Sequence, residues 1–130
     1  MQKFTLQIID QRFSVCRLPG NSPVPAWAFE GGFWSVTRSE QEVSIVCESH
    51  RVPVGIKSEP GWKAFRVKGI LEFSLTGVLS SLLEPLADAE ISVFALSTFN
   101  TDYLLIKDEK VEDAREVLAP VCHFETVSGF

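Results

Sequence analysis

The residue types that most often carry catalysis or bind metals are few and scattered in this chain of 130 residues. The cysteines are Cys16, Cys47 and Cys122, and the histidines are His50 and His123. No two cysteines form a C-x-x-C pair, and neither histidine stands in a cluster of carboxylates or cysteines, so neither a disulfide framework nor a metal site is predicted. We expect each cysteine to be a small buried hydrophobe in a strand rather than a reactive thiol.

Sequence motifs of the common enzyme classes are also missing. The chain contains no G-x-S-x-G, P-loop, H-E-x-x-H or G-x-G-x-x-G motif. A constellation such as His50, Glu72 and Asp102 stays open, because catalytic groups far apart in sequence can meet in the fold. The sequence therefore predicts a protein that is not an enzyme and that uses no cofactor.

Charge and composition indicate which classes of partner are not expected. The formal net charge is −5, and hydrophobic residues make up 45% of the chain, which is typical of a soluble globular protein with a core. Its fourteen aromatic residues are not interleaved with lysine or arginine as in an RNA-binding sheet. Nucleic acid is therefore not an expected partner.

Hydropathy gives no sign of a membrane segment. No apolar run approaches the roughly 20 residues that a membrane-spanning helix needs. Residues 1–7 alternate polar and apolar side chains rather than forming the apolar stretch of a signal peptide. We therefore expect a cytoplasmic protein without membrane contact.

The second half of the chain has the clearest periodicity. Leucines and one alanine recur at helical spacing over residues 79–87, with Pro85 inside the stripe, and predict an amphipathic helix that bends or tightens in its last turns. A shorter helix is expected from Asp108 to Pro120. We expect strands at 62–69, 91–96, 103–106 and 121–124, the middle two forming a hairpin. This order is β-α-β-β-α-β.

The first half contains more turn residues. Alternation predicts strands at 4–8 and 13–18, joined as a hairpin through residues 10–12. Residues 19–25 hold three prolines and predict a surface loop, followed by one helical turn at 26–30. Strands are expected at 33–37 and 43–47, with a capping box or a tight turn at 39–42. Residues 50–62 read as a junction between the halves.

An internal repeat links the two halves. At a lag of 60 residues, residues 34–37 fall over residues 94–97, and Glu42 falls over Asp102 in the turn of the second hairpin. The sequence thus predicts an α+β protein of two ferredoxin-like halves, 1–61 and 62–130, with antiparallel sheets. Halves of this size need a shared interface to complete a core, so we expect them to pack together.

One long stretch resembles a known family. Residues 73–79, with Thr76-Gly77, and residues 91–106, ISVFALSTFNTDYLLI, are similar to an ACT domain of the branch found in aspartate kinase regulatory domains and in arginine sensors. The resemblance covers about residues 62–120. Residues 1–61 share the hairpin but lack a leucine-rich helix, and are interpreted as a degenerate half.

The resemblance implies a regulatory, allosteric module that binds a small ligand, usually an amino acid, where paired domains meet. A helix beginning at Thr76-Gly77 would offer unpaired N–H groups to a ligand carboxylate, and Gly77 would allow close approach. Asp102 would hold the ligand ammonium or a basic side chain. The ligand-binding residues expected on this basis are Leu75, Thr76, Gly77, Val78, Asn100, Thr101 and Asp102.

Structural roles remain open for the same residues. Gly77 could serve close packing of a helix on a sheet, and Asp102 could cap its own turn. Two functions are therefore weighed. One is a tandem ACT-like regulator that binds an amino acid. The other is an interaction module without a ligand, acting as a homodimer or as the regulatory subunit of a separate enzyme through exposed sheet edges.

Overall fold

The computed structural model describes residues 3–69 and 77–130, which form two compact units. Unit 1 consists of Met1–Asp10 and Lys63–Ser128, and unit 2 of Gln11–Trp62 with Gly129–Phe130. The expected division between residues 61 and 62 lies next to the boundary between Trp62 and Lys63. Two segments differ from the expected halves: the first ten residues belong to the same unit as most of the second half, and Gly129–Phe130 belong to unit 2.

Unit 1 contains the β-α-β-β-α-β order expected for the second half. Its strands are β1 (Phe4–Ile9), the end of β5 (Lys57–Val67), β6 (Val93–Ser97), β7 (Asp102–Lys107) and β8 (Cys122–Val127). Its helices are α1 (Val78–Asp88), the short 3₁₀ helix η3 (Asp108–Lys110) and α2 (Val111–Leu118). The predicted α+β class is confirmed, with both α-helices and the β6–β7 hairpin where the periodicity placed them.

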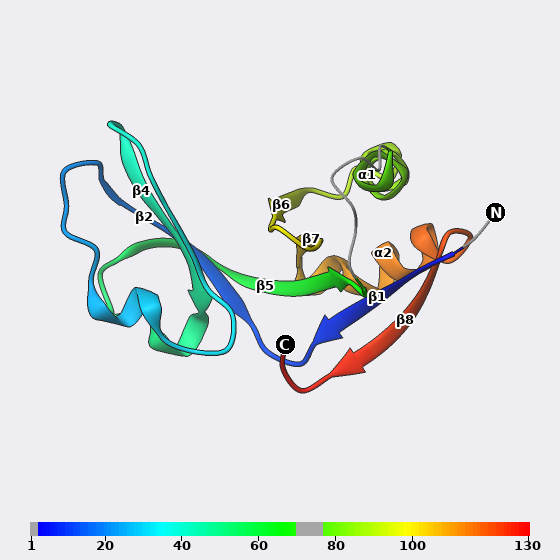
Figure 1. Ribbon diagram of the computed structural model, residues 1–130, viewed down its shortest axis with the longest axis horizontal. Coiled ribbons are helices and arrows are strands. Elements are labelled where there is room, and N and C mark those ends of the chain that lie inside the picture. Colours follow the sequence, from blue (N-terminus) through cyan, green and yellow to red (C-terminus); the bar gives the residue numbers. More distant parts are fainter. Residues whose placement is uncertain (1–2, 70–76) are drawn as a thin grey trace. The chain divides into compact units, whose positions relative to one another are not determined.

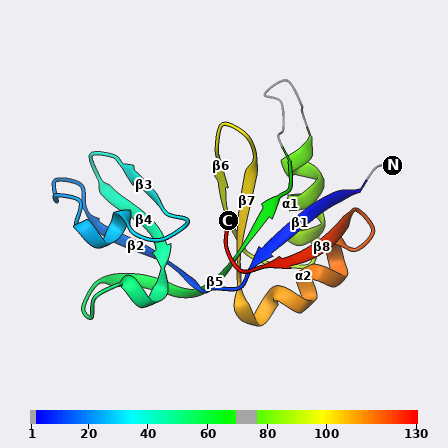
Figure 2. The ribbon, with the colours of Figure 1, turned by 60° about the horizontal axis from the view of Figure 1, so that its bottom comes forward.

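The sheet of unit 1 has the strand order β8-β1-β5-β7-β6 (Figure 2). Strand β1 runs antiparallel to β5, with Leu6 opposite Val67, and parallel to β8, with Leu6 opposite Phe124. The predicted hairpin between residues 4–8 and 13–18 is therefore wrong. Alternation of polar and apolar residues determines which face of a strand is buried, but it does not determine the partner strand.

One face of this sheet carries both α-helices. Leu82 and Leu86 of α1 and Leu118 of α2 are fully buried. They share a hydrophobic cluster with Leu6, Ile8, Phe65, Val67, Ile91, Leu104, Ile106, Ala114 and Cys122. Because side chains alternate along a strand, the residues between these core positions point to the opposite face of the sheet.

Helix α1 begins after Gly77, whose φ of +81° lies in the left-handed region. Glycine adopts this conformation without the steric cost that a side chain would impose. No side chain caps the first turn, and its first hydrogen bond joins the Ser81 N–H to the Gly77 carbonyl oxygen at 2.8 Å. Pro85 lies inside α1, and its carbonyl still accepts the Ala89 N–H at 3.2 Å.

Unit 2 has the four-stranded ferredoxin-like order, without the extra strand that β1 adds between β8 and β5 in unit 1, and it has 3₁₀ helices in place of α-helices. Its elements are β2 (Phe13–Pro19), η1 (Ala26–Phe29), β3 (Ser35–Arg38), β4 (Glu42–Glu48), η2 (Ser49–Arg51) and the first part of β5, the long strand drawn in green in Figure 1. The strands pair antiparallel in the order β3-β4-β2-β5. A second core forms around Cys16, Ala28, Val43, Ile45 and Cys47.

Of the two alternatives expected at residues 39–42, a capping box and a tight turn, the structure shows the tight turn. The Ser39 N–H donates to the Glu42 carbonyl oxygen at 2.8 Å, between β3 and β4. The β3–β4 and β6–β7 hairpins differ in register by two residues. Ser35 pairs with Val46 in the first hairpin, whereas Ala95, which corresponds to Ser35 at the lag of 60, pairs with Leu104 in the second. Both second strands still begin at the acidic residue that the repeat aligned.

The prediction of an irregular junction over all of residues 50–62 is wrong in its second part. Residues 57–62 belong to β5 and pair with β2. The pairing shifts between Phe13, opposite Trp62, and Val15, opposite Glu59, which leaves an extra residue on β5. Pro60 and Gly61 lie at this shift, and Gly61 has a φ of +84°. They form a β-bulge inside a continuous strand, where a proline and a glycine are tolerated.

Candidate functional site

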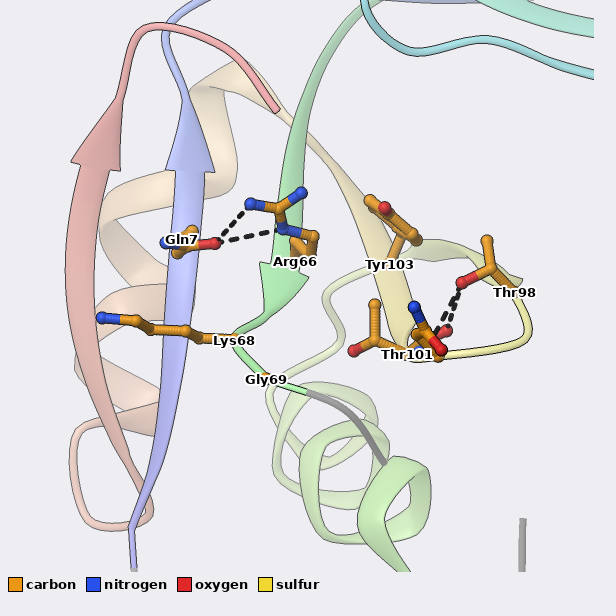
Figure 3. A pocket seen from close by; sticks show the side chains of 8 residues that line it. Gln7, Arg66, Lys68, Gly69, Thr98, Thr101 and Tyr103 are labelled. Atoms are coloured by element: carbon orange, nitrogen blue, oxygen red, sulfur yellow. Dashed lines mark hydrogen bonds between the residues drawn. The ribbon is translucent and has the colours of Figure 1, made fainter. Parts of the chain in front are cut away.

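A pocket of about 380 Å³ lies within unit 1 (Figure 3). Its lining comes from β1, from the end of β5 and the two residues after it, and from the β6–β7 turn with the start of β7. These residues are Gln7, Arg66, Lys68, Gly69, Thr98, Asn100, Thr101 and Tyr103. All but one of them are polar, so the pocket can form several hydrogen bonds to a small molecule.

Three of the lining residues lie on the face of the sheet opposite the helices, because each alternates with core residues of its strand: Gln7 in β1, Arg66 in β5 and Tyr103 in β7. We call this the polar face. Gln7 pairs with Arg66 on β5 and with Glu125 on β8, so the three side chains form one row across neighbouring strands. The fold thus brings together residues that are about 60 positions apart in the sequence.

Hydrogen bonds hold this row in place. The Gln7 Oε1 atom accepts from Arg66 Nε at 3.0 Å and from Arg66 Nη2 at 2.7 Å (Figure 3). The Gln7 Nε2 atom donates to Glu125 at 3.2 Å, and Lys68 Nζ donates to the other Glu125 oxygen at 3.0 Å. The contacts with Lys68 and then Gln7 hold the pKa of Glu125 below its ordinary value.

The β6–β7 turn closes another side of the pocket. Three hydrogen bonds join Thr98 and Thr101. The Thr98 hydroxyl donates to the Thr101 carbonyl oxygen and accepts from the Thr101 N–H, and the Thr98 N–H donates to the same carbonyl oxygen at 2.8 Å. Thr101 is 7% exposed, and its hydroxyl donates to the Val67 carbonyl oxygen at 2.7 Å. The turn is thereby attached to the end of β5, next to Arg66 and Lys68.

The residues predicted as a ligand site do not all lie at this pocket. Asn100 and Thr101 line it. Asp102 begins β7 and pairs with Ser97, whose hydroxyl donates to Asp102 Oδ1 at 2.7 Å. By alternation Asp102 shares the helix-covered face with Leu104. Gly77 and Val78 form the start of α1, and Leu75 and Thr76 lie outside the described residues.

The sequence did not predict the other six lining residues, which are Gln7, Arg66, Lys68, Gly69, Thr98 and Tyr103. A signal was present, because Arg66 and Lys68 alternate with Phe65 and Val67, and such alternation marks one polar face of a strand. The signal did not say which other strands contribute to that face. The pocket depends on the pairing of β1 with β5, whereas the sequence predicted a hairpin of β1 with β2.

The remaining residues considered for catalysis or metal binding are the cysteines, His50, Glu72 and Asp102. All three cysteines are buried thiols, and burial raises the pKa of Cys122 to about 11. No cluster of metal-ligating residues is found in the described part of the chain. His50 lies in unit 2, with its Nε2 atom 3.8 Å from Glu48 Oε1, and Asp102 lies in unit 1, while Glu72 is outside the described residues.

Within residues 3–69 and 77–130, no helix combines the length and apolarity needed to cross a membrane.

Each of the two parts of the chain matches a protein-family model. The model of the ACT domain matches residues 57–120, and a model of an N-terminal domain matches residues 11–55. A crystal structure of a protein from Agrobacterium tumefaciens is 34% identical, covers 98% of this chain over 96% of its own, and superposes with a TM-score of 0.91.

One further relative and one protein of similar fold carry functional names. The bovine (Bos taurus) protein named "Cytosolic arginine sensor for mTORC1 subunit 1" is 36% identical over an alignment of 108 residues, which covers 77% of this chain and 31% of that protein. This chain thus spans under a third of that curated relative. The regulatory subunit of aspartate kinase from Thermus thermophilus shares the fold, with a TM-score of 0.60 at 10% identity over 88% of this chain and 96% of its own. The chain belongs to the ACT domain family.

Proposed function

We propose that this chain is a regulatory ACT protein that binds a free amino acid in the pocket on the polar face of unit 1. The observation that carries the proposal is the pocket itself. Its volume of about 380 Å³ falls within the range of roughly 300–1,000 Å³ typical of small-molecule sites. Its side chains offer cationic groups for a carboxylate, and hydroxyl and amide groups for an ammonium or a polar side chain.

The comparisons support the class of ligand in general terms. The bovine relative is named for sensing arginine, and the ACT family model covers the part of this chain that contains most of the pocket. Binding would act on a separate protein by favouring one conformation of this chain over another. The β6–β7 turn, which lines the pocket and carries an exposed aromatic ring at Phe99, is a part of unit 1 that a ligand would contact directly.

A thermal-shift screen against the twenty amino acids at millimolar concentration tests the proposal. A ligand that binds only the folded chain raises its stability by RT ln(1 + [L]/Kd), so one amino acid or a small group should raise Tm. The rise should be lost in Arg66→Gln and kept in Lys57→Gln, because Lys57 is an exposed cation at the other end of β5. An absence of any shift, or an equal shift in Arg66→Gln, would count against binding at this pocket.

A second function, a protein interaction module, is supported by one feature of unit 2. Phe29 and Trp34 are 48% and 41% exposed, and their rings meet edge to face with centroids 5.2 Å apart. Exposed aromatic pairs of this kind are common at protein interfaces. If this function is the right one, Trp34→Ala should weaken co-purification with a partner, while amino acids should leave Tm unchanged.

A further inference from the structure

The charges that line the pocket have one sign. Among the described residues, the lining contains the cations Arg66 and Lys68, and none of the other six lining residues is acidic. This contrasts with the chain as a whole, whose formal net charge is −5. A positive site on an acidic protein attracts an anionic small molecule locally, although the protein as a whole repels it at long range.

The spacing of Arg66 and Lys68 allows each of them to contact one carboxylate of a ligand with two carboxylates. Arg66 lies in β5, and Lys68 follows the last residue of that strand on the same side. Two residues of extended chain separate their Cα atoms by roughly 7 Å. The side chains are long enough to converge on the two carboxylates of one amino acid, and a planar guanidinium can bind a carboxylate through two parallel hydrogen bonds.

Both cations already make contacts, and those of Arg66 include a neutral acceptor. Its guanidinium donates to Gln7 Oε1, a neutral amide oxygen, so a carboxylate of the ligand would be a stronger acceptor than this partner. Lys68 is 54% exposed and already forms an ion pair with Glu125 at 3.0 Å, so part of its charge is compensated. Glu125 itself does not line the pocket.

We infer that this pocket selects its amino acid by charge, binding one with an acidic side chain more tightly than its neutral isostere, and a neutral one more tightly than a cationic one. The inference rests on the proposed function and specifies the ligand of the same site. It also separates this chain from the bovine relative, because arginine is the charge type that this lining disfavours.

Two pairs of nearly isosteric amino acids measure the selection directly. Isothermal titration calorimetry on the full chain would compare glutamate with glutamine and citrulline with arginine, each pair differing by one charge. We expect glutamate and citrulline to bind roughly three- to tenfold more tightly than their partners, as one exposed or half-buried charge contact allows. The ratios should shrink when NaCl is raised to about 500 mM, because salt screens exposed charges.

Variants assign the selection to the two cations. In Arg66→Gln and in Lys68→Gln the glutamate-to-glutamine ratio should fall toward one, while in Lys57→Gln it should stay at the wild-type value. Lys68 and Lys57 are both exposed, so Lys68→Gln tests the inference even if Arg66→Gln fails to fold.

The outcomes keep the two proposals apart. Equal affinities within both pairs, or tighter binding of arginine than citrulline, would overturn charge selection while leaving amino-acid binding intact. If none of the four ligands binds but another amino acid does, charge selection is again overturned. If no amino acid binds at all, the proposed function itself fails, and the inference fails with it.

Discussion

The hydroxyl of Thr101 donates to the carbonyl oxygen of Val67 at 2.7 Å, although 34 positions separate the two residues in the sequence. Val67 is the last residue of β5, and Thr101 is the last residue of the β6–β7 turn. This single bond therefore joins the two segments that carry most of the pocket. It also gives a hydrogen-bond partner to the hydroxyl of Thr101, a side chain that is almost completely buried.

Replacing Thr101 with valine should destabilise unit 1. The change keeps the shape of the side chain but leaves the Val67 carbonyl without its donor, which costs about 1–3 kcal/mol of unfolding free energy for a buried group. Urea unfolding would measure the loss. Thr126→Val, at an exposed position of β8, is the matched control and should change stability by less than about 0.5 kcal/mol. Equal effects of the two variants would show that the bond contributes nothing.

Gly31 should tolerate a side chain less well than Gly55. Both have a positive φ, +102° and +94°, so alanine is strained at either position. A Cβ at Gly31 would also lie 2.7 Å from Glu48 Oε1, whereas a Cβ at Gly55 would meet nothing within 4 Å. Glu48 is 4% exposed, and its Oε1 accepts from Arg51 Nε at 2.6 Å, so the carboxylate has little room to move.

Chemical unfolding of the two glycine variants tests this difference. Gly55→Ala should lose about 1 kcal/mol from backbone strain alone. Gly31→Ala should lose a further ~1–3 kcal/mol, because the new methyl group crowds the buried Glu48 carboxylate in its ion pair with Arg51. Equal losses would mean that the loop at Gly31 relaxes away from Glu48.

Cys122 should make stability depend on alkaline pH. Burial raises the pKa of its thiol from an ordinary value near 9 to about 11, with a small opposing effect of Lys3. The thiol is neutral in both states below pH 9, so its contribution is complete there. Between pH 9 and 11 the unfolded chain releases the proton first, and about 2–3 kcal/mol of stability is lost.

The difference in unfolding free energy between wild type and Cys122→Ala isolates this thiol from other groups that titrate in the same range. The advantage of wild type over the variant should shrink between pH 9 and 11 and stay constant from pH 6 to 8. A difference that stays constant up to pH 11 would show that the thiol titrates alike in both states.

Asn100 and Asp102 distinguish the pocket from the helix-start site expected from the sequence. If the ligand lies in the pocket, Asn100→Ala should weaken binding severalfold, because the side chain lines that space. Asp102→Asn should change the affinity by less than about twofold, since its carboxylate accepts from Ser97 on the other face of the sheet. The opposite ranking in calorimetry would favour a ligand at the start of α1, near Gly77 and Val78.

The fold of unit 1 was predicted where local pattern determines structure. The leucine stripe of α1 and the apolar runs of β6 and β7 each lie within a short stretch of sequence, and β6 and β7 pair with each other across a short turn. The pairing of β1 was not predicted, because its partners β5 and β8 lie more than 50 residues away and several strands of the chain share the same alternation.

The pocket was predicted only in its turn, at Asn100 and Thr101. These two residues lie in a motif that resembles the ACT family, whereas Gln7 and Arg66 meet through long-range strand pairing. The bulge at Pro60 and Gly61 shows a second limit. Proline and glycine usually end a strand, but here they occupy an irregular position inside β5, and only the register with β2 distinguishes the two cases.

The most direct test of the central claim is a ¹⁵N-¹H NMR titration of the labelled chain with the amino acid that gives the largest thermal shift. If the ligand occupies the pocket on the polar face, the largest changes in chemical shift should fall on the amides of Gln7, Arg66, Thr98, Thr101 and Tyr103. The amides of unit 2 around Val43 and Ile45 should change little. Changes confined to residues outside the pocket, or none at saturating ligand, would contradict the account.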